Sequence, residues 1–243
     1  VRDILIIERN GYLGGVLQQC IHNGFGLHRF SEDLTGVEFA RKYRDMVDEL
    51  NISYMLDTFV IEMNDQRQIT AVNPEEGLIQ IQAKAIVLAM GCRERTRNNL
   101  LIPGTRGAGI LTAGSAQRYL NINGYLPGRK VVILGSGDIG LIMARQFVLE
   151  GAEVEAVVEV MPYSGGLPRN MKQCIEDFDI PVYYESTVSE IKGKERVSSV
   201  VVSRVDENRR PVPGTEFEIE CDTLMISAGL IPENELTEQA GIE

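Results

Sequence analysis

Residues 130–159 contain the pattern that most restricts how this chain can fold. An apolar run at residues 130–134 leads directly into the sequence Gly-Ser-Gly-Asp-Ile-Gly at residues 135–140. Apolar residues at helical spacing follow over residues 141–150, and a second apolar run at residues 154–158 ends in an acid. This order of strand, glycine turn, helix, strand and acid is typical of a mononucleotide-binding βαβ unit, so we predict an α/β fold with parallel strands.

The glycines of this turn have three physical roles. Gly135 permits a tight turn, Gly137 lets the backbone approach a pyrophosphate, and Gly140 lets helix and strand pack closely. The N–H groups and the positive dipole end of the following helix then face the phosphates. We interpret the turn as phosphate-binding, with a plain βα connection as the alternative. The predicted nucleotide-binding residues here are Gly135, Ser136, Gly137, Asp138, Ile139 and Gly140, with capping of the helix as an alternative role for Asp138.

Glu159 ends the second strand of this unit. A carboxylate in this place can accept hydrogen bonds from both hydroxyls of the NAD ribose, and it repels the 2′-phosphate of NADP. The next residues, Val160, Met161 and Pro162, supply no cation that could hold such a phosphate. The sequence therefore favours NAD over NADP as the ligand. The alternative interpretation is an exposed glutamate at a strand end.

The start of the chain repeats part of this order. Residues 3–7 form an apolar run that ends before Glu8, and a tyrosine and two glycines follow Glu8 at offsets of four, six and seven. The same residue types follow Glu159 at the same offsets. The two matching sets are Glu8, Tyr12, Gly14 and Gly15, and Glu159, Tyr163, Gly165 and Gly166.

Two further features occur once in each half of the chain. Short strands separated by turn residues occupy residues 58–82 and again residues 187–221, which predicts a β-meander in each copy. Each meander is followed by an apolar strand that ends in glycine, at residues 85–91 and 223–229. The shared order indicates two related domains. The predicted fold is therefore α/β, with two Rossmann-like dinucleotide-binding domains that carry β-meander insertions.

The repeat also predicts a segment ahead of this sequence. The glycine turn at residue 135 precedes Glu159 by 24 residues, and the same spacing before Glu8 falls upstream of Val1. We therefore expect the first strand, phosphate turn and helix of the first domain to precede Val1. We expect the same domain to be open at its C-terminal end.

In the first copy, Glu8 occupies the place of Glu159 and is expected to bind the ribose of a second dinucleotide. Gly14 and Gly15 would let the chain pass close to the pyrophosphate of that dinucleotide. An ordinary loop is the alternative for this glycine pair, because paired glycines often mark turns.

Cys20 and His22 lie just past this glycine pair. A thiol beside a redox cofactor can act as a nucleophile, and a nearby histidine makes a thiol more reactive. No second cysteine is near in sequence, so a buried wall residue is the favoured interpretation of Cys20, and the roles of both residues stay open. Three arginines follow the first strand that ends in glycine: Arg93, Arg95 and Arg97. We expect them either to contact a phosphate of the substrate or cofactor or to form a solvated charged face.

The charge balance and the cysteine pattern exclude several functional classes. The 24 basic and 35 acidic residues give a net charge of −11, which repels nucleic acids and anionic lipid. The apolar runs have strand length and are too short to span a bilayer, and the sequence shows no signal peptide pattern. The cysteines lack a C-x-x-C or regular spacing, so we expect a reducing, cytoplasmic protein with neither a disulfide framework nor a metal site. They are Cys20, Cys92, Cys174 and Cys221.

These segments together resemble the FAD- and NAD-dependent pyridine nucleotide-disulfide oxidoreductase superfamily. Within it, the chain is similar to the bacterial branch that lacks the redox disulfide and is related to the α subunits of dye-linked proline dehydrogenase and hydrogen cyanide synthase. The likeness covers nearly the whole chain. It is carried by residues 4–9 with Leu13-Gly14-Gly15, residues 86–91, Ile102-Pro103-Gly104, residues 131–140, and residues 225–229 with Pro232.

The resemblance implies a flavin domain that is split around an inserted nicotinamide domain. We expect a partial FAD-binding domain at residues 1–101, an NAD-binding domain at residues 102–230, and the start of the return to the FAD domain at residues 231–243. The resemblance implies FAD and NAD as cofactors, and the paired cysteines that reduce thiol substrates have no counterpart in the sequence. The additional residues that the resemblance assigns to cofactor binding are Arg9, Val60, Ala89, Gly91, Ala228 and Gly229.

The sequence thus predicts a flavin-dependent oxidoreductase that transfers hydride between NAD(H) and FAD. The further electron donor or acceptor is an unidentified small molecule or a partner subunit. One alternative is a nucleotide-binding subunit of a larger dehydrogenase complex with no turnover of its own. Another is a dithiol reductase that uses Cys20 with a distant cysteine. The expected partners are a small-molecule substrate and a partner subunit or a second copy of the chain, with no nucleic acid or membrane.

Overall fold

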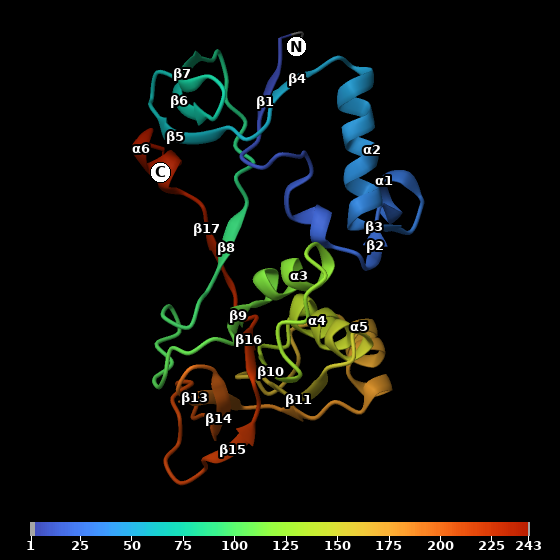
Figure 1. The fold of residues 1–243 in the computed structure, drawn as a ribbon, viewed down its shortest axis with the longest axis vertical. Coiled ribbons are helices and arrows are strands. Elements are labelled where there is room, and N and C mark those ends of the chain that lie inside the picture. Colours follow the sequence, from blue (N-terminus) through green and yellow to red (C-terminus); the bar gives the residue numbers. More distant parts are fainter. Residues whose placement is uncertain (1–2, 243) are drawn as a thin grey trace. The chain divides into compact units, whose positions relative to one another are not determined.

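The computed structural model describes residues 3–242, and the chain divides into two compact units (Figure 1). Unit 1 comprises Val1–Cys92 and Pro232–Glu243, and unit 2 comprises Arg93–Ile231. The chain passes between the units twice, in strands β8 (Cys92–Glu94) and β17 (Leu230–Pro232), which pair with each other. Unit 2 begins at Arg93 rather than at residue 102, because residues just past Cys92 are already tied to the returning strand. The Arg95 N–H donates to the Gly229 carbonyl at 3.0 Å.

The core of unit 2 is a five-stranded parallel sheet in the order β12-β11-β10-β16-β9. Its central strand, β10, is apolar at four successive positions that are all buried, as expected for a parallel strand covered on both faces. In chain order the strands are β9 (Ile110–Thr112), β10 (Lys130–Leu134), β11 (Glu153–Val158), β12 (Val182–Tyr183) and β16 (Thr223–Ile226). The parallel sheet confirms the predicted α/β class.

Alternate residues of β10 point to different layers, because side chains of a strand alternate between its two faces. Val131 and Ile133 pack with Phe147 in a core formed with the helices, while Val132 and Leu134 belong to a second core formed with a β-meander. Each fully buried side chain of this kind stabilises the fold by about 1.5–3 kcal/mol. The helical layer contains α3 (Ala113–Asn121), α4 (Asp138–Leu149), α5 (Pro168–Cys174) and the short helix η2 (Glu176–Phe178).

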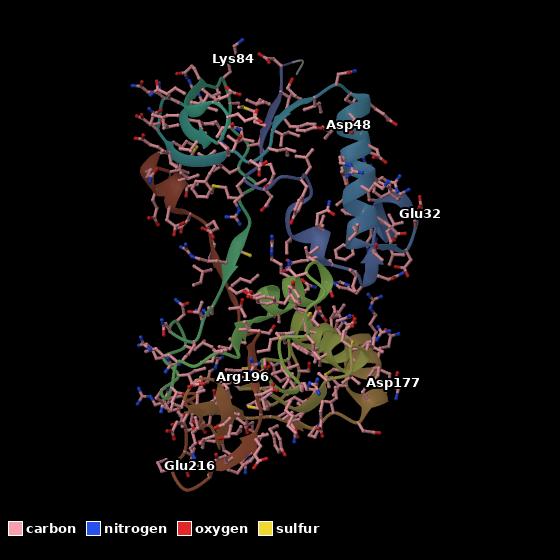
Figure 2. The ribbon with its side chains drawn as sticks, in the orientation of Figure 1. Glu32, Asp48, Lys84, Asp177, Arg196 and Glu216 are labelled. Atoms are coloured by element: carbon pink, nitrogen blue, oxygen red, sulfur yellow. The ribbon has the colours of Figure 1, made fainter. Side chains whose placement is uncertain are left out.

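The meander of unit 2 is the antiparallel sheet β13-β14-β15, and it lies where the sequence predicted it. Its strands are β13 (Ser186–Gly193), β14 (Val197–Arg204) and β15 (Phe217–Glu220). Arg196, labelled in Figure 2, joins the turn before β14 to the main sheet. Its guanidinium donates to the Thr223 hydroxyl at 2.9 Å, to the Asp222 carbonyl at 2.8 Å and to the Pro127 carbonyl.

Unit 1 has the same kinds of parts in smaller sheets. β1 (Leu5–Ile7) and β4 (Ser53–Met55) pair in parallel, and β5, β6 and β7 form the predicted antiparallel meander. A side-chain capping box between Thr35 and Glu38 starts the long helix α2. The remaining elements are η1 (Gly15–Gln19), β2 (Asn23–Phe25), α1 (Leu27–Phe30), β3 (Leu34–Thr35), α2 (Gly36–Glu49), β5 (Phe59–Met63), β6 (Gln68–Asn73), β7 (Gly77–Gln82) and α6 (Glu235–Gln239).

The backbone hydrogen bonds support the internal repeat. In each unit, the acid after the apolar strand accepts a backbone bond from the residue that leads into the meander, and the residue before that donor has a φ of 49°. The equivalent bonds run from Thr58 N to Glu8 O at 2.9 Å and from Ser186 N to Glu159 O at 3.0 Å, after Asp57 and Glu185 respectively. The two units therefore share local geometry as well as sequence order.

The strand predicted at residues 85–91 is wrong. These residues follow an irregular path, and the side chain of Val87 is 92% exposed. The corresponding strand of unit 2, β16, pairs with β10 on one side and β9 on the other. In the described part of unit 1, no strand takes the place of β10, so this apolar segment has no backbone partner of that kind.

Within residues 3–242, the helices all lack the combination of length and apolar character that crossing a bilayer requires.

Candidate nucleotide-binding site

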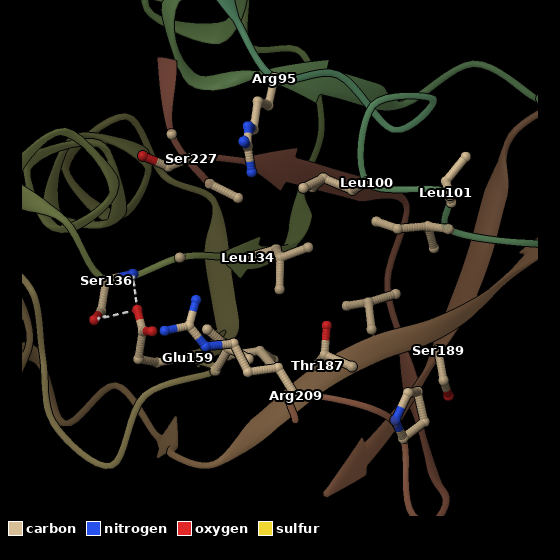
Figure 3. A pocket seen from close by; sticks show the side chains of 18 of the residues that line it. Arg95, Leu100, Leu101, Leu134, Ser136, Glu159, Thr187, Ser189, Arg209 and Ser227 are labelled. Carbon is tan, nitrogen blue, oxygen red and sulfur yellow. Dashed lines mark hydrogen bonds between the residues drawn. The ribbon is translucent and has the colours of Figure 1, made fainter. Parts of the chain in front are cut away.

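A cavity of about 590 Å³ lies in unit 2 at the carboxyl ends of β10, β11 and β16 (Figure 3). These ends are where open parallel sheets bind ligands, next to the strand at which the strand order reverses. Six residues that the sequence assigned to nucleotide binding line the cavity: Gly135, Ser136, Gly137, Glu159, Ala228 and Gly229. The other members of the predicted turn, Asp138, Ile139 and Gly140, continue from the cavity into α4.

The glycines of the turn face different surroundings. Gly135 has a φ of 107°, and a Cβ on it would meet the Ser227 carbonyl oxygen. A Cβ on Gly140 would meet the Gly135 carbonyl, so this glycine allows helix and turn to approach. By contrast, a Cβ on Gly137 would meet no heavy atom within 4 Å. The backbone is therefore open to a ligand at Gly137 and closed by packing at the other two positions.

The N-terminus of α4 lies directly beyond this opening. The first helical acceptor is the Gly137 carbonyl, which receives the Leu141 N–H at 3.1 Å. The first N–H groups of a helix have no acceptor within the helix, and they carry the positive end of its dipole. At α4 these groups belong to Asp138 and the residues after it. Phosphate oxygens are acceptors that match such an array.

Glu159 is buried against the turn and is not an exposed glutamate at a strand end. Only 7% of the surface of Glu159 is exposed to solvent. One carboxylate oxygen, Oε2, accepts from the Ser136 N–H at 2.8 Å and from the Ser136 hydroxyl at 2.6 Å. The other, Oε1, accepts from the Met161 N–H at 2.8 Å. The carboxylate thus fixes the glycine turn, and Oε1 keeps a lone pair for a further donor.

Asp138 does not cap α4, which corrects the alternative role inferred from the sequence. The N-cap of α4 is Gly137, and no side chain bonds there. Oδ1 of Asp138 instead accepts from the Leu167 N–H and from the Asn170 side-chain amide, each at 2.7 Å. Because Asp138 is the first residue of α4 rather than its N-cap, its side chain reaches outward to the start of α5.

A short loop after Glu159 packs on the same turn. The Ser164 hydroxyl donates to the Ser136 carbonyl at 2.9 Å, and the Gly165 N–H donates to the Ser136 hydroxyl at 3.2 Å. A Cβ on Gly166 would collide with the side chain of Leu141. The glycine pair that repeats in both halves of the sequence was the signal that could have identified this loop as part of the site.

The three candidate arginines have different positions. Arg95 lines the cavity, and its side chain lies next to Gly229 (Figure 3). Arg97 donates from Nη2 to the Gly104 carbonyl at 2.8 Å, so it holds the local backbone. Arg93 is exposed. Of the three, Arg95 is therefore the one positioned to meet a ligand in the cavity.

Several lining residues come from segments that sequence reasoning did not connect with the turn. Residues 100–103 and 187–189 supply walls, and Arg209 and Pro211 reach the cavity from the loop between β14 and β15. No local signal marks Arg209, because its loop is far from Glu159 in sequence and is brought there by the fold of the meander.

In unit 1, Glu8 is half-buried at the end of β1. Its Oε1 accepts from the Asn10 N–H at 2.8 Å and from the Asn10 side-chain amide at 2.9 Å, a pattern that parallels the bond between Glu159 and Met161. Arg9, the next residue, is exposed. The carboxylate of Glu8 is therefore held by Asn10, its near neighbour in sequence. Glu8 has the same position in its unit's motif as Glu159, which lines the cavity of unit 2.

The other predicted residues of unit 1 are only partly drawn together. Gly14 and Gly15 begin the short helix η1, and Val60 lies in β5, whose approach is bonded to Glu8. Ala89 and Gly91 lie on the irregular segment at residues 85–91, and both are exposed. A hydrogen bond from Thr58, the residue before the strand of Val60, thus connects that strand to Glu8. None of the described hydrogen bonds connects Ala89 or Gly91 to Glu8.

Cys20 is buried, with its sulfur 3.4 Å from the Val16 carbonyl, to which it donates. The ring of His22 packs against Phe25 with centroids 5.2 Å apart, and its Nδ1 lies 3.1 Å from the Asn23 carbonyl. Among the described residues, the Nε2 atom of His22 has no hydrogen-bond partner, and it is buried. These contacts place Cys20 in a packed wall, as the favoured interpretation of the sequence expected.

Burial changes the titration of three groups in unit 2. It raises the pKa of the Cys221 thiol to about 12, and it raises the pKa of Cys174. Burial, and then the Glu159 carboxylate, raise the pKa of Tyr184. The thiols and the phenol therefore stay protonated near neutral pH, and they serve as packing groups.

Within the described range, no three His, Cys, Asp or Glu side chains are grouped to hold a metal ion.

The residues of unit 2 fit a dinucleotide. The cavity volume falls in the range of about 300–1,000 Å³ that small-molecule sites occupy. An open backbone at Gly137, a helix N-terminus beyond it, and a buried carboxylate beside it match a pyrophosphate and a ribose. The open space at Gly137 is the observation that distinguishes a ligand cradle from a packed βα turn.

Known proteins with similar sequences include subunits of larger enzymes. The chain is 25% identical to hydrogen cyanide synthase subunit HcnB of Pseudomonas protegens, and the match covers 100% of this chain and 54% of that protein. It is 28% identical to sarcosine oxidase subunit alpha of Rhizobium meliloti, over 65% of this chain and 14% of that protein. The chain thus spans about half the length, or less, of these curated relatives.

The fold is similar to that of thioredoxin reductase from T. acidophilum, with a TM-score of 0.75 and 21% sequence identity. That match covers 99% of this chain and 73% of the reductase. A family model described as pyridine nucleotide-disulphide oxidoreductase matches residues 3–243. With its two repeated units and its Rossmann-type cavity, the chain belongs to the pyridine nucleotide-disulphide oxidoreductase family, a family of flavin-dependent oxidoreductases.

Proposed function

We propose that this chain carries the nucleotide-binding part of an oxidoreductase in which hydride passes between NAD(H) and FAD. Unit 2 would bind NAD(H), and unit 1 would contribute to the FAD site. The observation that carries the proposal is the cavity in which an open glycine turn, a helix N-terminus and the buried carboxylate of Glu159 converge. The bound nicotinamide and flavin would supply the redox chemistry, and the chain would supply binding and orientation.

In unit 2, several of the predicted residues would have a task in binding. The N–H groups at the start of α4 would receive the pyrophosphate next to Gly137. Glu159 would use its remaining lone pair on Oε1 to accept a ribose hydroxyl, while its other bonds keep Ser136 in place. Ala228 and Gly229 would border the nucleotide at the other end of the cavity, where β16 has ended.

In unit 1, the FAD assignment depends on the repeat. Glu8 would bind the adenosine ribose, Gly14 and Gly15 would approach the pyrophosphate, and the backbone near Val60 would meet the adenine. The equivalent hydrogen bonds of Glu8 and Glu159 to their meanders support this assignment, because they place both acids at the same point of the motif. The proposed FAD contacts of unit 1 are Glu8, Arg9, Gly14, Gly15, Val60, Ala89 and Gly91.

A second candidate function is a nucleotide-binding subunit of a larger dehydrogenase without turnover of its own. The similar proteins named above are themselves subunits of hydrogen cyanide synthase and sarcosine oxidase, which favours this candidate. NADH-dependent reduction of an artificial dye by the purified protein would support an independent enzyme. Dye reduction that requires a co-purifying subunit would support the subunit role.

The binding proposal is tested by titrating the chain with NADH and following nucleotide fluorescence. Gly137→Val fills open space without a backbone clash, so the variant should fold, with a loss of about 1 kcal/mol or less because valine is a poorer N-cap of α4 than glycine. It should nevertheless bind NADH at least about tenfold more weakly, the equivalent of about 1.4 kcal/mol.

The matched control is Asn123→Val, which adds the same side chain at an exposed position outside the cavity lining. This control should bind NADH as the parent chain does. Equal NADH affinity of Gly137→Val and the parent chain would contradict the proposed site.

A further inference from the structure

Arg209 lies on a loop whose shape is fixed by its own hydrogen bonds. The loop joins β14 to β15, and a bridge between Val205 and Pro211 closes it. Oδ1 of Asp206 accepts from the Asn208 N–H at 2.9 Å and from the Arg210 N–H at 2.8 Å. The Arg209 N–H donates to the Asp206 carbonyl at 2.8 Å. These bonds fix the backbone at Arg209 and therefore the direction of its Cα–Cβ bond.

The backbone of Arg209 has a φ of 61°, in the left-handed region that residues other than glycine adopt at a cost. Such a conformation persists only where surrounding bonds hold it, and it often marks a functional position. Here the Asp206 turn holds it. The loop therefore keeps the backbone at Arg209 in a conformation that an unconstrained chain would leave.

The side chain of Arg209 lines the same cavity as Glu159, and Figure 3 shows its guanidinium directed toward that carboxylate. Arg209 is exposed, and within residues 3–242 no hydrogen bond or ion pair engages its guanidinium. The cavity has two basic lining residues, and the other, Arg95, lies next to Gly229. A cation is therefore placed at the Glu159 end of the cavity with all five of its donors available.

The chemistry at this end concerns the adenosine ribose. A carboxylate at the strand end repels a 2′-phosphate, which is why Glu159 by itself favours NAD. In the fold, however, three protein donors already occupy the Glu159 carboxylate. A guanidinium binds phosphate through two parallel N–H bonds, and it would offset the repulsion. The Glu159 carboxylate can therefore accept from a ribose hydroxyl, and the Arg209 guanidinium can bind a 2′-phosphate where the ribose carries one.

We propose that Arg209 is a specificity-determining residue that binds the 2′-phosphate of NADP(H), so that the cavity accepts NADP(H) as well as NAD(H). This inference rests on the proposed nucleotide-binding function of unit 2. It names a residue that lies outside the βαβ motif, on a loop of the meander. Arg209 acts on binding and takes no part in hydride transfer.

The test is equilibrium titration of the full 243-residue chain with NADH and with NADPH, at low and high salt. The parent chain should bind the two nucleotides with affinities within about tenfold of each other, a difference of about 1.4 kcal/mol or less. Arg209→Ala should weaken NADPH binding about tenfold and change NADH binding less than about twofold, and Arg209→Lys should restore part of the loss. Salt should weaken NADPH binding more than NADH binding in the parent chain, but not in Arg209→Ala.

The matched control is Arg210→Ala, because Arg210 is the next residue and is exposed but does not line the cavity. This variant should retain the parent affinities for both nucleotides. An equal loss of NADH and NADPH binding in Arg209→Ala would mean that the guanidinium packs on the adenine, and it would overturn the proposal. NADH binding with no measurable NADPH binding in the parent chain would overturn it as well. If the parent chain binds neither nucleotide, the proposed function itself fails.

Discussion

Two acids, Glu8 in unit 1 and Glu159 in unit 2, end equivalent strands but have different surroundings. The Glu159 carboxylate binds Ser136 of the glycine turn and Met161, and it is buried. The Glu8 carboxylate binds Asn10, its near neighbour in sequence, and it is half-buried. The difference teaches that the acid and its near neighbours in sequence form similar contacts in both units, while the cavity of unit 2 also requires the glycine turn of the adjacent strand.

The same contrast appears in the apolar strands that end in glycine. In unit 2, Leu224 and Met225 of β16 are fully buried between neighbouring strands and two layers. In unit 1, the corresponding residues 85–91 are irregular, and Val87 is exposed. An apolar sequence thus becomes a strand only when a partner strand accepts its backbone hydrogen bonds.

The largest expected difference between the units is in backbone protection. Amides of β16 should exchange hydrogen with solvent at least about 10³-fold more slowly than amides of residues 85–91, because core strands open only with the whole domain. Hydrogen exchange followed by mass spectrometry measures both segments in one sample. Equal exchange rates would show that residues 85–91 have a strand partner in solution, and the contrast between the units would disappear.

A glycine substitution should affect the two units to different extents. Gly135→Ala combines a φ of 107° with a collision against the Ser227 backbone, so it should lower the free energy of unfolding by about 3–5 kcal/mol. Gly15→Ala has a φ of 52° and open space around it, so it should cost about 1–2 kcal/mol. Urea denaturation of both variants gives the two values. Similar losses would mean that the turn of unit 2 relaxes around the added methyl group.

The two acids should differ when each is replaced by glutamine. Glu159→Gln loses an acceptor for buried donors and should lower the free energy of unfolding by about 1.5–3 kcal/mol. Glu8→Gln keeps one oxygen for both Asn10 donors and should cost about 0.5 kcal/mol or less. Thermal unfolding monitored by circular dichroism would check the order. A larger loss for Glu8→Gln would indicate that Glu8 has partners beyond Asn10.

The last expected contrast concerns the thiols. Burial raises the pKa of Cys221 in unit 2 to about 12, so at pH 8 about one part in 10⁴ of this thiol is thiolate, the reactive form. Cys92, at the edge of unit 1, is exposed. Iodoacetamide should therefore label Cys92 first, and labelling of Cys221 should follow unfolding. Peptide mapping by mass spectrometry identifies the labelled residue, and rapid labelling of Cys221 in the folded chain would show that unit 2 opens readily.

The sequence alone was sufficient for the features that depend on neighbours along the chain. Apolar spacing and the glycine turn predicted β10, α4, β11 and both meanders, and equal offsets after Glu8 and Glu159 predicted two related units. The backbone hydrogen bonds of helices, turns and hairpins join residues within a short stretch of sequence, and apolar spacing shows which face of an element is buried, so these elements are readable there.

The tertiary structure decided what depends on distant partners. It brought Arg209 to the cavity that Glu159 also lines, and it turned Asp138 toward Leu167. Within residues 3–242, it left residues 85–91 without a strand partner. No pattern near these residues specifies such outcomes, because a strand needs the backbone of another strand and a binding cavity needs walls from several loops. The sequence therefore determined the glycine-turn motif, and the packing of the meander against the sheet determined which charged groups reach the cavity that Glu159 lines.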